Sequence, residues 1–584
     1  MRRSDQYLLP VSKPSLAEGE YDIYPAFRIT ENKISKGFGA LAEIIKNYSR
    51  VIIDGYNGVF FDIFQNTLDK ILSQNGRRIS WINTSSFYKP EQQIREMTAP
   101  FLGGNDPLFG KISSLKLEDF FIEDTITSVE PDTDSDLSIL IGPGASLASW
   151  EGLLIYIDIP KNEIQFRSRA GTVSNLGLSA PSEPKLMYKY YYFEEWVVLN
   201  KHKRKILSSI DIFVDGQRPD VPVWMEGTTL RESLFHMSRN VFRARPWFEP
   251  GAWGGTWIKY NIRGLNKNVP NYAWSFELIS PENGLLIESS SLLCEVSFDS
   301  LMYLQAAEVL GECYPEFGTR FPIRFDFLDT FDGGNLSLQC HPRPGYIKEN
   351  FGEDFTQEET YYILDTKDSA DVYLGFRDDV TPGNFRQDLE DSFEKKIPFD
   401  ADRYIIRHPV KKHDLLLIPY GTIHGSGKNN LVLEISTTPY IFTFKMYDWL
   451  RPDLDGQPRP LNIGRGMDNL YFDRKGDYVY KNLISRPELL EEGSDWRLFR
   501  LPTHKTHSYD VHRYHFSSEI DVPTNNKCLV MSLTEGKSIV VETENGFEQS
   551  FNYAETFVIP AAAGSVRIKN HSAEKAILVK AFMK

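Results

Sequence analysis

Alternating apolar and polar residues dominate the chain from about residue 235 onward. The runs at 321–328 (FPIRFDFL), 336–341 (LSLQCH) and 431–436 (LVLEIS) have a period of two, which is typical of strands with one buried face. Glycine, proline and asparagine separate these runs. Many short strands between turn residues predict a β-sandwich or barrel. Helical patterns interrupt it at 300–312 and 382–396.

The first part of the chain has a different pattern, because its apolar runs are continuous rather than alternating. Residues 49–64 (SRVIIDGYNGVFFDIF) indicate a strand, a glycine-containing turn and a helix, and 137–147 (LSILIGPGASL) and 152–160 (GLLIYIDIP) are two more continuous apolar strands, with helical stretches elsewhere in this part. Continuous apolar strands are typical of a sheet that is buried on both faces. The last hundred residues again consist of alternating strands, with hairpin turns and no helical stretch. The predicted fold class is therefore α/β plus mainly β, with three domains at 1–225, 235–487 and 488–584.

Four polar residues at strand ends and turns form a candidate metal site. Gln339 and His341 share one face of their strand and lie about 7 Å apart, from a rise of ~3.3 Å per residue. Glu359 stands just before an aromatic, β-rich run, and His424 follows a strand and a tight turn. These oxygen and nitrogen donors suit Zn²⁺ or another divalent first-row metal. The alternative is that the two histidines are ordinary hydrogen-bonded residues at strand ends.

Other histidines are interpreted as surface residues. His408 and His413 flank one predicted strand on its exposed side. A second group carries four histidines. Two of them, His512 and His515, are three residues apart, and this spacing does not place them on one face of a strand. Titratable surface histidines explain this group better than a second metal site does. Its members are His504, His507, His512 and His515.

Charge and composition exclude several classes of partner. The 584 residues carry a formal net charge of −15, and no basic stripe offsets the acidic residues, which argues against nucleic acid. No apolar run approaches the ~20 residues of a membrane helix. The four cysteines form no CxxC pair and the first residues do not resemble a secretory signal. We therefore expect a reduced, cytoplasmic protein with no membrane partner.

Several motifs, taken in order, resemble the class I mannose-6-phosphate isomerases, which are cupin enzymes. They are LSLQCHP, QEETYYIL, IPYGTIH, LVLEIS and YDWLRP, preceded by AWGGTW, AWSFELISPENG and FPIRFDFLD and followed by PRPLNI and ETFVIPAAAG. The resemblance covers about residues 247–584. It implies two cupin-type β-barrel (jelly-roll) domains with helical insertions. It also implies that Gln339, His341, Glu359 and His424 bind zinc.

The resemblance further implies an aldose–ketose isomerase whose substrate is a sugar phosphate, with mannose 6-phosphate converted to fructose 6-phosphate. Proton transfer between C1 and C2 needs a base and a cation for the phosphate or the developing oxyanion. Arg451 occupies the place of the family's active-site arginine; the alternative is a surface arginine before a turn. Glu434 lies on the strand that follows His424 and is either a pocket residue or an inert strand carboxylate.

The chain departs from the family's pattern at two places. The lysine that usually precedes the Gln-x-His strand is replaced by Asp326, with Arg324 on the same strand face. After His341-Pro342 the family has an acid, whereas this chain has Arg343. Binding of a phosphate would then need Arg324, Arg343 or Lys348 in place of the lysine. The alternative function is a sugar-phosphate sensor or regulatory protein without turnover; an iron cupin oxygenase is disfavoured, because its site leaves positions open beside a His/carboxylate facial set.

The N-terminal part shows a second resemblance, to uridine-kinase-type P-loop domains. It rests on VIIDGYNGVFFD, INTSSFYKP, FGKISSLKLEDF, GPGASL and LLIYIDIP, in this order. A working P-loop needs a glycine-rich turn followed by Lys-Ser or Lys-Thr, which hold the phosphates. Residues 54–61 have Phe60 and Phe61 instead, and Asp54 is expected to cap a turn. We predict a degenerate kinase-like domain that does not transfer phosphate.

Overall fold

The computed structural model describes residues 1–437 and 442–584, which form two compact units. The first unit consists of Met1–Ser15, Tyr24–Met237 and Pro281–Ala306, and the second of Leu16–Ile23, Ser238–Ser280 and Ala307–Lys584. Strands and helices are both present, and six sheets are found in the described residues. No helix within these residues is both long enough and apolar enough to cross a membrane.

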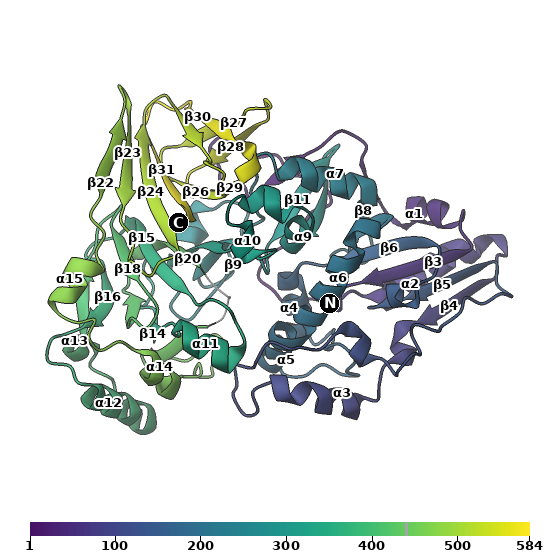
Figure 1. The fold of residues 1–584 in the computed structure, drawn as a ribbon, viewed down its shortest axis with the longest axis horizontal. Coiled ribbons are helices and arrows are strands. Elements are labelled where there is room, and N and C mark those ends of the chain that lie inside the picture. The colour runs from purple at the N-terminus through teal and green to yellow at the C-terminus, as the bar shows by residue number, and fades with distance from the viewer. Residues whose placement is uncertain (438–441) are drawn as a thin grey trace. The chain divides into compact units, whose positions relative to one another are not determined.

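A seven-stranded sheet in the order β2-β8-β7-β6-β3-β5-β4 forms the centre of the first unit (Figure 1). The five strands from β7 to β4 are parallel, whereas β8 and β2 run antiparallel to their neighbours. Its strands are β2 (Ile34–Lys36), β3 (Arg50–Gly55), β4 (Ile79–Asn83), β5 (Leu137–Ile141), β6 (Leu153–Asp158), β7 (Ile212–Asp215) and β8 (Val223–Glu226). The runs 49–64, 137–147 and 152–160 therefore each contain a strand, as predicted, and the structure shows that these three strands are parallel.

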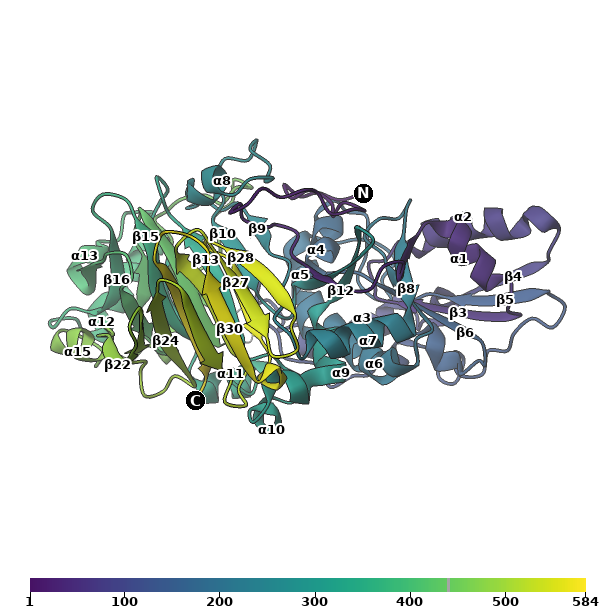
Figure 2. The same ribbon diagram turned by 90° about the horizontal axis from the view of Figure 1, so that it is seen from above.

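Helices pack on both faces of this sheet, which explains why its strands are apolar throughout. Neighbouring residues of β3 belong to different cores: Ile53 packs with residues of α1 and α2, whereas Ile52 packs with residues of α3, α4 and α6. Figure 2 shows these helices above and below the strands. The helices of this unit are α1 (Phe38–Ile45), α2 (Phe61–Leu72), α3 (Glu91–Thr98), α4 (Lys161–Arg169), α5 (Pro184–Tyr190), α6 (Trp196–Ile206) and α7 (Gly227–Met237). A π-helical turn at Tyr191–Glu195 joins α5 to α6.

Strands distant in the sequence form a small second sheet in the first unit. β1 (Ala26–Arg28) pairs in parallel with β11 (Gly284–Ser289), which pairs antiparallel with β12 (Leu292–Ser297). The segment that contains β11 and β12 thus belongs to the first unit, although about 40 residues of the second unit precede it in the sequence. α9 (Phe298–Leu310) then leads from residues of the first unit to those of the second, at the position of the predicted helix 300–312.

A buried carboxyl group in the first unit gives a testable dependence of stability on pH. Glu282 accepts hydrogen bonds from the Tyr188 hydroxyl (2.8 Å) and the Gln165 amide (2.7 Å), and burial raises its pKa to about 7. In the unfolded chain this pKa is ~4.3, so between pH ~4 and 7 the folded state holds a proton that the unfolded state has released. The contribution of Glu282 to stability is therefore lost as pH rises through this range.

Replacing Glu282 by glutamine is expected to stabilise the protein at pH 8, by up to about 3 kcal/mol, and to change little at pH 4.5. The amide is neutral at both values, and Gln165 can turn its own amide to keep the hydrogen bond. Urea unfolding of the parent and of Glu282→Gln at the two pH values measures this difference. A difference that is equal at both pH values would contradict the buried-carboxyl explanation.

Two facing antiparallel sheets form the first half of the second unit. One has the order β18-β15-β20-β13-β10-β9 and the other β17-β16-β19-β14-β21. Residues from both sheets, among them Leu328, Tyr361 and Leu374, share one apolar core. The strands are β9 (Trp247–Glu249), β10 (Trp274–Leu278), β13 (Ile323–Asp329), β14 (Leu338–Cys340), β15 (Glu358–Thr366), β16 (Asp371–Phe376), β17 (Ile405–Pro409), β18 (Leu415–Ile418), β19 (His424–Ser426), β20 (Asn430–Thr437) and β21 (Phe444–Tyr447). This mixed arrangement, mostly of sheet, is consistent with a cupin-like fold.

Helices lie between these strands or follow the last of them; the sequence predicted the stretch 382–396, which forms α12, but not the other helices of this part. The helices are α8 (Trp257–Asn261), α10 (Tyr314–Phe317), α11 (Pro344–Phe351), α12 (Pro382–Lys395), α13 (Ala401–Tyr404), α14 (Ile463–Asn469) and α15 (Asp477–Asn482). The start and end of α12 follow from local chemistry: the Thr381 hydroxyl accepts a hydrogen bond from the Asn384 amide (3.3 Å), and Lys396 ends the helix in the left-handed conformation.

The second half of the second unit is again a pair of sheets. Their orders are β22-β23-β24-β31-β26-β29 and β25-β30-β27-β28, and Figure 2 shows the yellow strands of the four-stranded sheet beside β24. Met531 and Leu578 of one sheet pack with Phe551 and Ile568 of the other. The strands are β22 (Glu488–Glu492), β23 (Trp496–Leu501), β24 (Tyr509–Phe516), β25 (Glu519–Pro523), β26 (Leu529–Glu535), β27 (Ser538–Thr543), β28 (Glu548–Asn552), β29 (Thr556–Ile559), β30 (Ser565–Asn570) and β31 (Ala576–Met583).

Candidate metal centre

Three strands of the second unit bring two histidines and a glutamate together. His341 directly follows β14, Glu359 lies on β15 and His424 begins β19. One ligand atom from each lies within 4.8 Å of the others, and the three side chains are at most 1% exposed. In the described residues this is the one group of histidine, cysteine and acidic side chains with metal-binding geometry.

Hydrogen bonds to the backbone set the orientation of both imidazoles. His341 Nδ1 lies 3.2 Å from the carbonyl oxygen of Phe442, and His424 Nδ1 lies 2.9 Å from that of Thr422. A carbonyl oxygen can only accept, so each Nδ1 carries the proton and each Nε2 presents a lone pair. Both Nε2 atoms face Glu359 Oε2: His424 at 3.5 Å, and His341 in direct contact. The two lone pairs and the carboxylate therefore converge on one point.

Gln339 lies beside this group. β14 pairs with β19 in a register that places Gln339 opposite His424; the Gln339 amide nitrogen lies 3.4 Å from His424 Nε2, and its amide oxygen accepts a hydrogen bond from the Ser337 hydroxyl (3.1 Å). The other carboxylate oxygen of Glu359 is buried and accepts no hydrogen bond from the described residues. Two imidazole nitrogens, one carboxylate and one amide oxygen match the preferences of Zn²⁺ and of other divalent first-row metals. The residues present thus fit the metal that the sequence implies.

The pKa of His341 agrees with a neutral imidazole at this position. Burial lowers the pKa of His341. Burial alone would raise the pKa of Glu359, whereas positive charge beside it, from a protonated imidazole or a bound metal, lowers that pKa. A deprotonated carboxylate and two neutral imidazoles are the forms that ligate a metal.

Glu434 lies on β20 and shares a hydrogen-bonding partner with Glu359. The Gln357 amide donates to Glu434 Oε1 at 3.1 Å and to Glu359 Oε2 at 3.4 Å. Glu434 is only 4% exposed, and burial raises its pKa well above the ordinary value. The strand carboxylate is therefore joined to the metal-binding group through Gln357, a residue that the sequence analysis did not single out.

Two cations that the sequence offered as replacements for the missing lysine have other partners. Arg324 forms an ion pair with Asp326 (2.9 Å) and reaches Glu434 at 3.5 Å. Arg343 donates to the backbone carbonyls of Asn469 (2.8 Å) and Leu470 (2.6 Å). Lys348, the third candidate, is exposed on α11.

Arg451 lies in a cluster that the sequence analysis had only partly identified. Its guanidinium pairs with Asp448 at 2.8 Å, and Arg459 pairs with the same carboxylate at 2.6 Å. Asp448 is 6% exposed. A fourth residue, Lys445 on β21, is paired across the sheet with Gln339. In the sequence, Lys445 stands between the apolar residues Phe444 and Met446. This alternation was the signal that could have identified Lys445 as a polar residue on a strand.

Comparison with curated proteins finds distant relatives of this chain. The chain is 27% identical over 262 residues to a probable mannose-6-phosphate isomerase, GmuF, of Bacillus subtilis; the match covers 45% of this chain and 75% of the relative. It is 20% identical over 328 residues to the mannose-6-phosphate isomerase ManA of the same organism, covering 56% and 95%. A relative from Streptococcus mutans, also a mannose-6-phosphate isomerase, is 26% identical over 37% of this chain and 64% of its own length.

Solved structures and family models add two further matches. The crystal structure of a mannose-6-phosphate isomerase from Bacillus subtilis covers 58% of this chain and 99% of its own, with 20% identity and a TM-score of 0.47. Residues 37–239 match the model of a domain of unknown function (DUF8485). The curated relatives, at 20–27% identity, are named as mannose-6-phosphate isomerases, one of them as probable. The resemblance of the N-terminal residues to a P-loop kinase stays a prediction.

The interpretation of the C-terminal histidines as surface residues was wrong for two of them. His504 is 6% exposed and bonds to the Tyr478 hydroxyl at 3.2 Å, and His507 is 2% exposed and stacks on Tyr509. His413 is also partly buried, between the Tyr362 hydroxyl (2.7 Å) and Glu535 (2.8 Å). Tertiary packing, which the local spacing does not show, places these side chains inside the second unit.

In the first unit, Asp54 ends β3 as a fully buried carboxylate. It accepts hydrogen bonds from the backbone amides of Gly55 (2.7 Å), Gly144 (2.9 Å) and Ser146 (2.9 Å). The Ser146 hydroxyl (2.5 Å) and His202 Nε2 (2.8 Å) also bond to it. Burial alone would raise the pKa of Asp54, but His202 and these donors hold it below its ordinary value. The carboxylate thus fixes the turns that follow β3 and β5.

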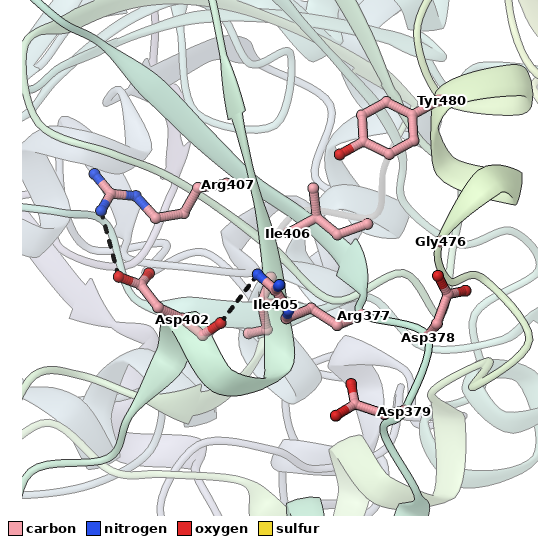
Figure 3. A pocket seen from close by; sticks show the side chains of 9 residues that line it. All are labelled: Arg377, Asp378, Asp379, Asp402, Ile405, Ile406, Arg407, Gly476 and Tyr480. Carbon is pink, nitrogen blue, oxygen red and sulfur yellow. Dashed lines mark hydrogen bonds and ion pairs between the residues drawn. The ribbon is translucent and has the colours of Figure 1, made fainter.

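A surface pocket of about 620 Å³ lies elsewhere in the second unit (Figure 3). Its wall mixes acids and bases, and Figure 3 shows Arg407 and Arg377 both reaching Asp402. The lining is Arg377, Asp378, Asp379, Asp402, Ile405, Ile406, Arg407, Gly476 and Tyr480. None of these residues belongs to the metal-binding group.

Proposed function

We propose that this protein is a metal-dependent aldose–ketose isomerase that converts mannose 6-phosphate and fructose 6-phosphate into one another. The observation that carries the proposal is the buried group of His341, Glu359 and His424, whose imidazole lone pairs converge on one carboxylate. The relatives at 20–27% identity support the same reaction class. Gln339 is the fourth ligand, and Zn²⁺ or another divalent first-row metal is the cofactor.

The protein side chains supply proton transfer and charge. When bound, the metal acts as a Lewis acid toward the substrate's carbonyl and hydroxyl oxygens. Glu434, with a raised pKa, exchanges the proton between C1 and C2, and its hydrogen bond from Gln357 fixes its orientation. Arg451 supplies positive charge for the phosphate or for the enediolate that forms. Burial of the whole group excludes water from the reactive atoms.

A coupled assay with mannose 6-phosphate on the metal-loaded chain tests this proposal. Formation of fructose 6-phosphate, dependent on the added metal, is the expected result. No turnover of any hexose or pentose phosphate would refute it. That outcome would favour the second candidate function, a sugar-phosphate sensor. The observation that favours a sensor is the ion pair between Asp326 and Arg324, which neutralises the charge of Arg324.

The same proposal extends to the organisation of the chain. Residues 235–487 hold the metal site in a first cupin domain, 488–584 form a second cupin domain, and 1–225 form a degenerate kinase-like domain. The parallel strand order β4-β5-β3-β6-β7 in the first unit supports the last assignment. The buried Asp54 carboxylate at the end of β3, and the absence of lysine in the turn that follows, argue against phosphate chemistry there.

We expect no transfer of phosphate from ATP to nucleosides or sugars by the full chain. Phe61 begins α2 where a phosphate-binding helix needs a hydroxyl, and Arg167 stacks on the ring of Phe60 at 4.0 Å. Transfer of radiolabelled phosphate to uridine and to hexoses measures this, with an active uridine kinase as the positive control. Transfer above the enzyme-free background would contradict the prediction.

A further inference from the structure

Two turns carry the histidines of the metal-binding group, and a hydrogen bond joins these turns directly. The Gly421 amide, three residues before His424, donates to the carbonyl oxygen of His341 at 2.9 Å. Gly421 has a φ of +72°, and a Cβ atom there would lie 2.6 Å from the carbonyl oxygen of Asn469. Glycine is therefore needed where these segments approach one another. The orientation of the two imidazoles depends on what holds this contact in place.

The chain that leaves α14 contacts both turns. The Tyr471 amide donates to the carbonyl oxygen of Gly421 at 2.9 Å, on the turn before the second histidine. The Asn469 side-chain oxygen accepts from the Arg343 amide at 2.7 Å, two residues after the first histidine. We call residues 469–474 the backing segment, because they lie behind both histidine-bearing turns.

Arg474, at the end of the backing segment, holds the turn that leads to His424. Its Nη1 lies within hydrogen-bonding reach of the carbonyl oxygens of Pro419 (2.9 Å) and Tyr420 and of the Thr422 hydroxyl (2.5 Å). The carbonyl oxygen of Thr422 in turn accepts from His424 Nδ1 at 2.9 Å. The guanidinium thus fixes the stretch of backbone that orients this imidazole.

Arg343 fixes the other end of the backing segment. Its Nε and Nη2 donate to the carbonyl oxygens of Asn469 (2.8 Å) and Leu470 (2.6 Å). The guanidinium carbons of Arg343 and Arg474 lie 3.9 and 4.5 Å from the centre of the Tyr471 ring. Guanidiniums stack favourably on aromatic rings. One ring therefore connects the two arginines.

Both arginines hold backbone rather than balance acidic groups. Within the part of the chain that the structure describes, neither guanidinium forms a salt bridge, and their hydrogen bonds go to carbonyl oxygens and one hydroxyl. At position 343 the resembling family has an acid. A carboxylate can only accept hydrogen bonds, so it could not bond to the carbonyl oxygens that Arg343 contacts. The departure from the family's pattern is therefore explained by these backbone contacts.

We propose that Arg343 and Arg474 are positioning residues for the metal: through the backing segment they set the two turns that aim His341 and His424 at one point. The inference rests on the metal site of the proposed function and does not require the isomerase reaction. A residue that hydrogen-bonds to a metal ligand typically changes metal affinity about 10–100-fold. The two arginines act one contact further away, so the loss of either is expected to weaken metal binding about tenfold, at the lower end of this range.

Titration of the metal-free full chain with Zn²⁺, against a competing chelator, measures this affinity without turnover. Arg474→Met and Arg343→Met are each expected to bind Zn²⁺ about tenfold more weakly than the parent. Co²⁺, whose visible absorption depends on the geometry of its ligands, gives a second measurement, and its spectrum should change in both variants.

Arg513→Met is the matched control. Arg474 and Arg513 are both 7% exposed, and Arg513 also donates to a backbone carbonyl, that of His413 at 3.0 Å. Its loss should lower the thermal stability of the chain but leave the Zn²⁺ affinity and the Co²⁺ spectrum as in the parent.

Variants of Tyr471 test whether the two arginines act through one ring. Tyr471→Phe keeps the ring and should bind Zn²⁺ like the parent, since the hydroxyl has no hydrogen-bonding partner among the described residues. Tyr471→Leu should weaken binding about as much as either arginine variant. The double variant of Arg343 and Arg474 should lose less affinity than the product of the two single losses, because both residues act on the same segment.

The outcomes separate positioning from packing and from the reaction. Zn²⁺ affinity within twofold of the parent in both arginine variants would overturn the proposal, whatever their thermal stability. An equal loss of affinity in Arg513→Met, with unchanged Co²⁺ spectra throughout, would also overturn it, because general destabilisation then explains the loss. Weaker binding confined to the arginine variants and Tyr471→Leu, in a chain without isomerase activity, would support the positioning role and refute the proposed reaction. A parent chain that binds no metal would overturn both.

Discussion

A chain in which alanine replaces both His341 and His424 is expected to lose its bound metal and its isomerase activity. These residues supply two of the four proposed ligands, and each presents an Nε2 lone pair that a backbone carbonyl holds in place. Loss of a residue that only hydrogen-bonds to a metal ligand typically lowers metal affinity about 10–100-fold. Loss of two ligands should therefore lower metal affinity by more than about 10²-fold. Metal analysis by mass spectrometry after dialysis, together with the coupled assay, measures both effects.

His408→Ala is the control for this prediction, because His408 lies on β17, outside the metal-binding group. Thermal unfolding shows whether the double variant is folded, and Gln339→Ala, which removes a ligand with less change of the core, gives a second test. Metal content equal to that of the parent in the double variant would refute the site. Reduced metal with unchanged activity would refute the role of the metal in the reaction.

The sequence was sufficient to predict the strands that carry this site. Alternation in LSLQCH places Gln339 and His341 on one face, and the structure puts β14 at that position, with His341 in the metal-binding group and Gln339 beside His424. Local patterns succeed here because one buried face requires a period of two. The same reasoning left Glu434 as either a pocket residue or an inert strand carboxylate, and its link to Glu359 through Gln357 needed coordinates.

Partners distant in the sequence could not be predicted. The sequence placed Arg324 on the same face as Asp326, but nothing local shows that the two form an ion pair that also reaches Glu434 across the sheet. Lys445 lies opposite Gln339 because of the register between β14 and β21. These two strands are more than 100 residues apart, so the local sequence does not show this pairing. The parallel pairing of β1 with β11 is of the same kind, since it joins residues near 27 to residues near 287.

The burial of the C-terminal histidines also could not be predicted from the local sequence. The spacing of the C-terminal histidines correctly excludes one face of a strand for His512 and His515. It gives no information on the packing of the loop before β24, where His507 stacks on Tyr509. A buried imidazole is expected to be neutral, and burial lowers the pKa of His507 well below its ordinary value.

Replacing Arg451 by alanine is expected to lower kcat/KM by roughly 10²–10³, the cost of losing one preorganised donor to a developing negative charge. Arg451 is partly buried and Asp448 fixes one edge of its guanidinium. Water that fills the vacated volume cannot replace a fixed positive charge beside a phosphate or an enediolate. Steady-state kinetics with mannose 6-phosphate, at matched metal content, measures the loss.

Arg377→Ala is the matched control for Arg451→Ala, since Arg377 is an exposed arginine of the surface pocket shown in Figure 3. It should keep the parent rate. Arg451→Lys should recover part of the activity, because charge returns without the two-pronged geometry that pairs with Asp448. An Arg451→Ala variant with kcat/KM within twofold of the parent would refute the role of Arg451. In that case Arg459, which binds the same Asp448 carboxylate, would carry the positive charge that the reaction needs.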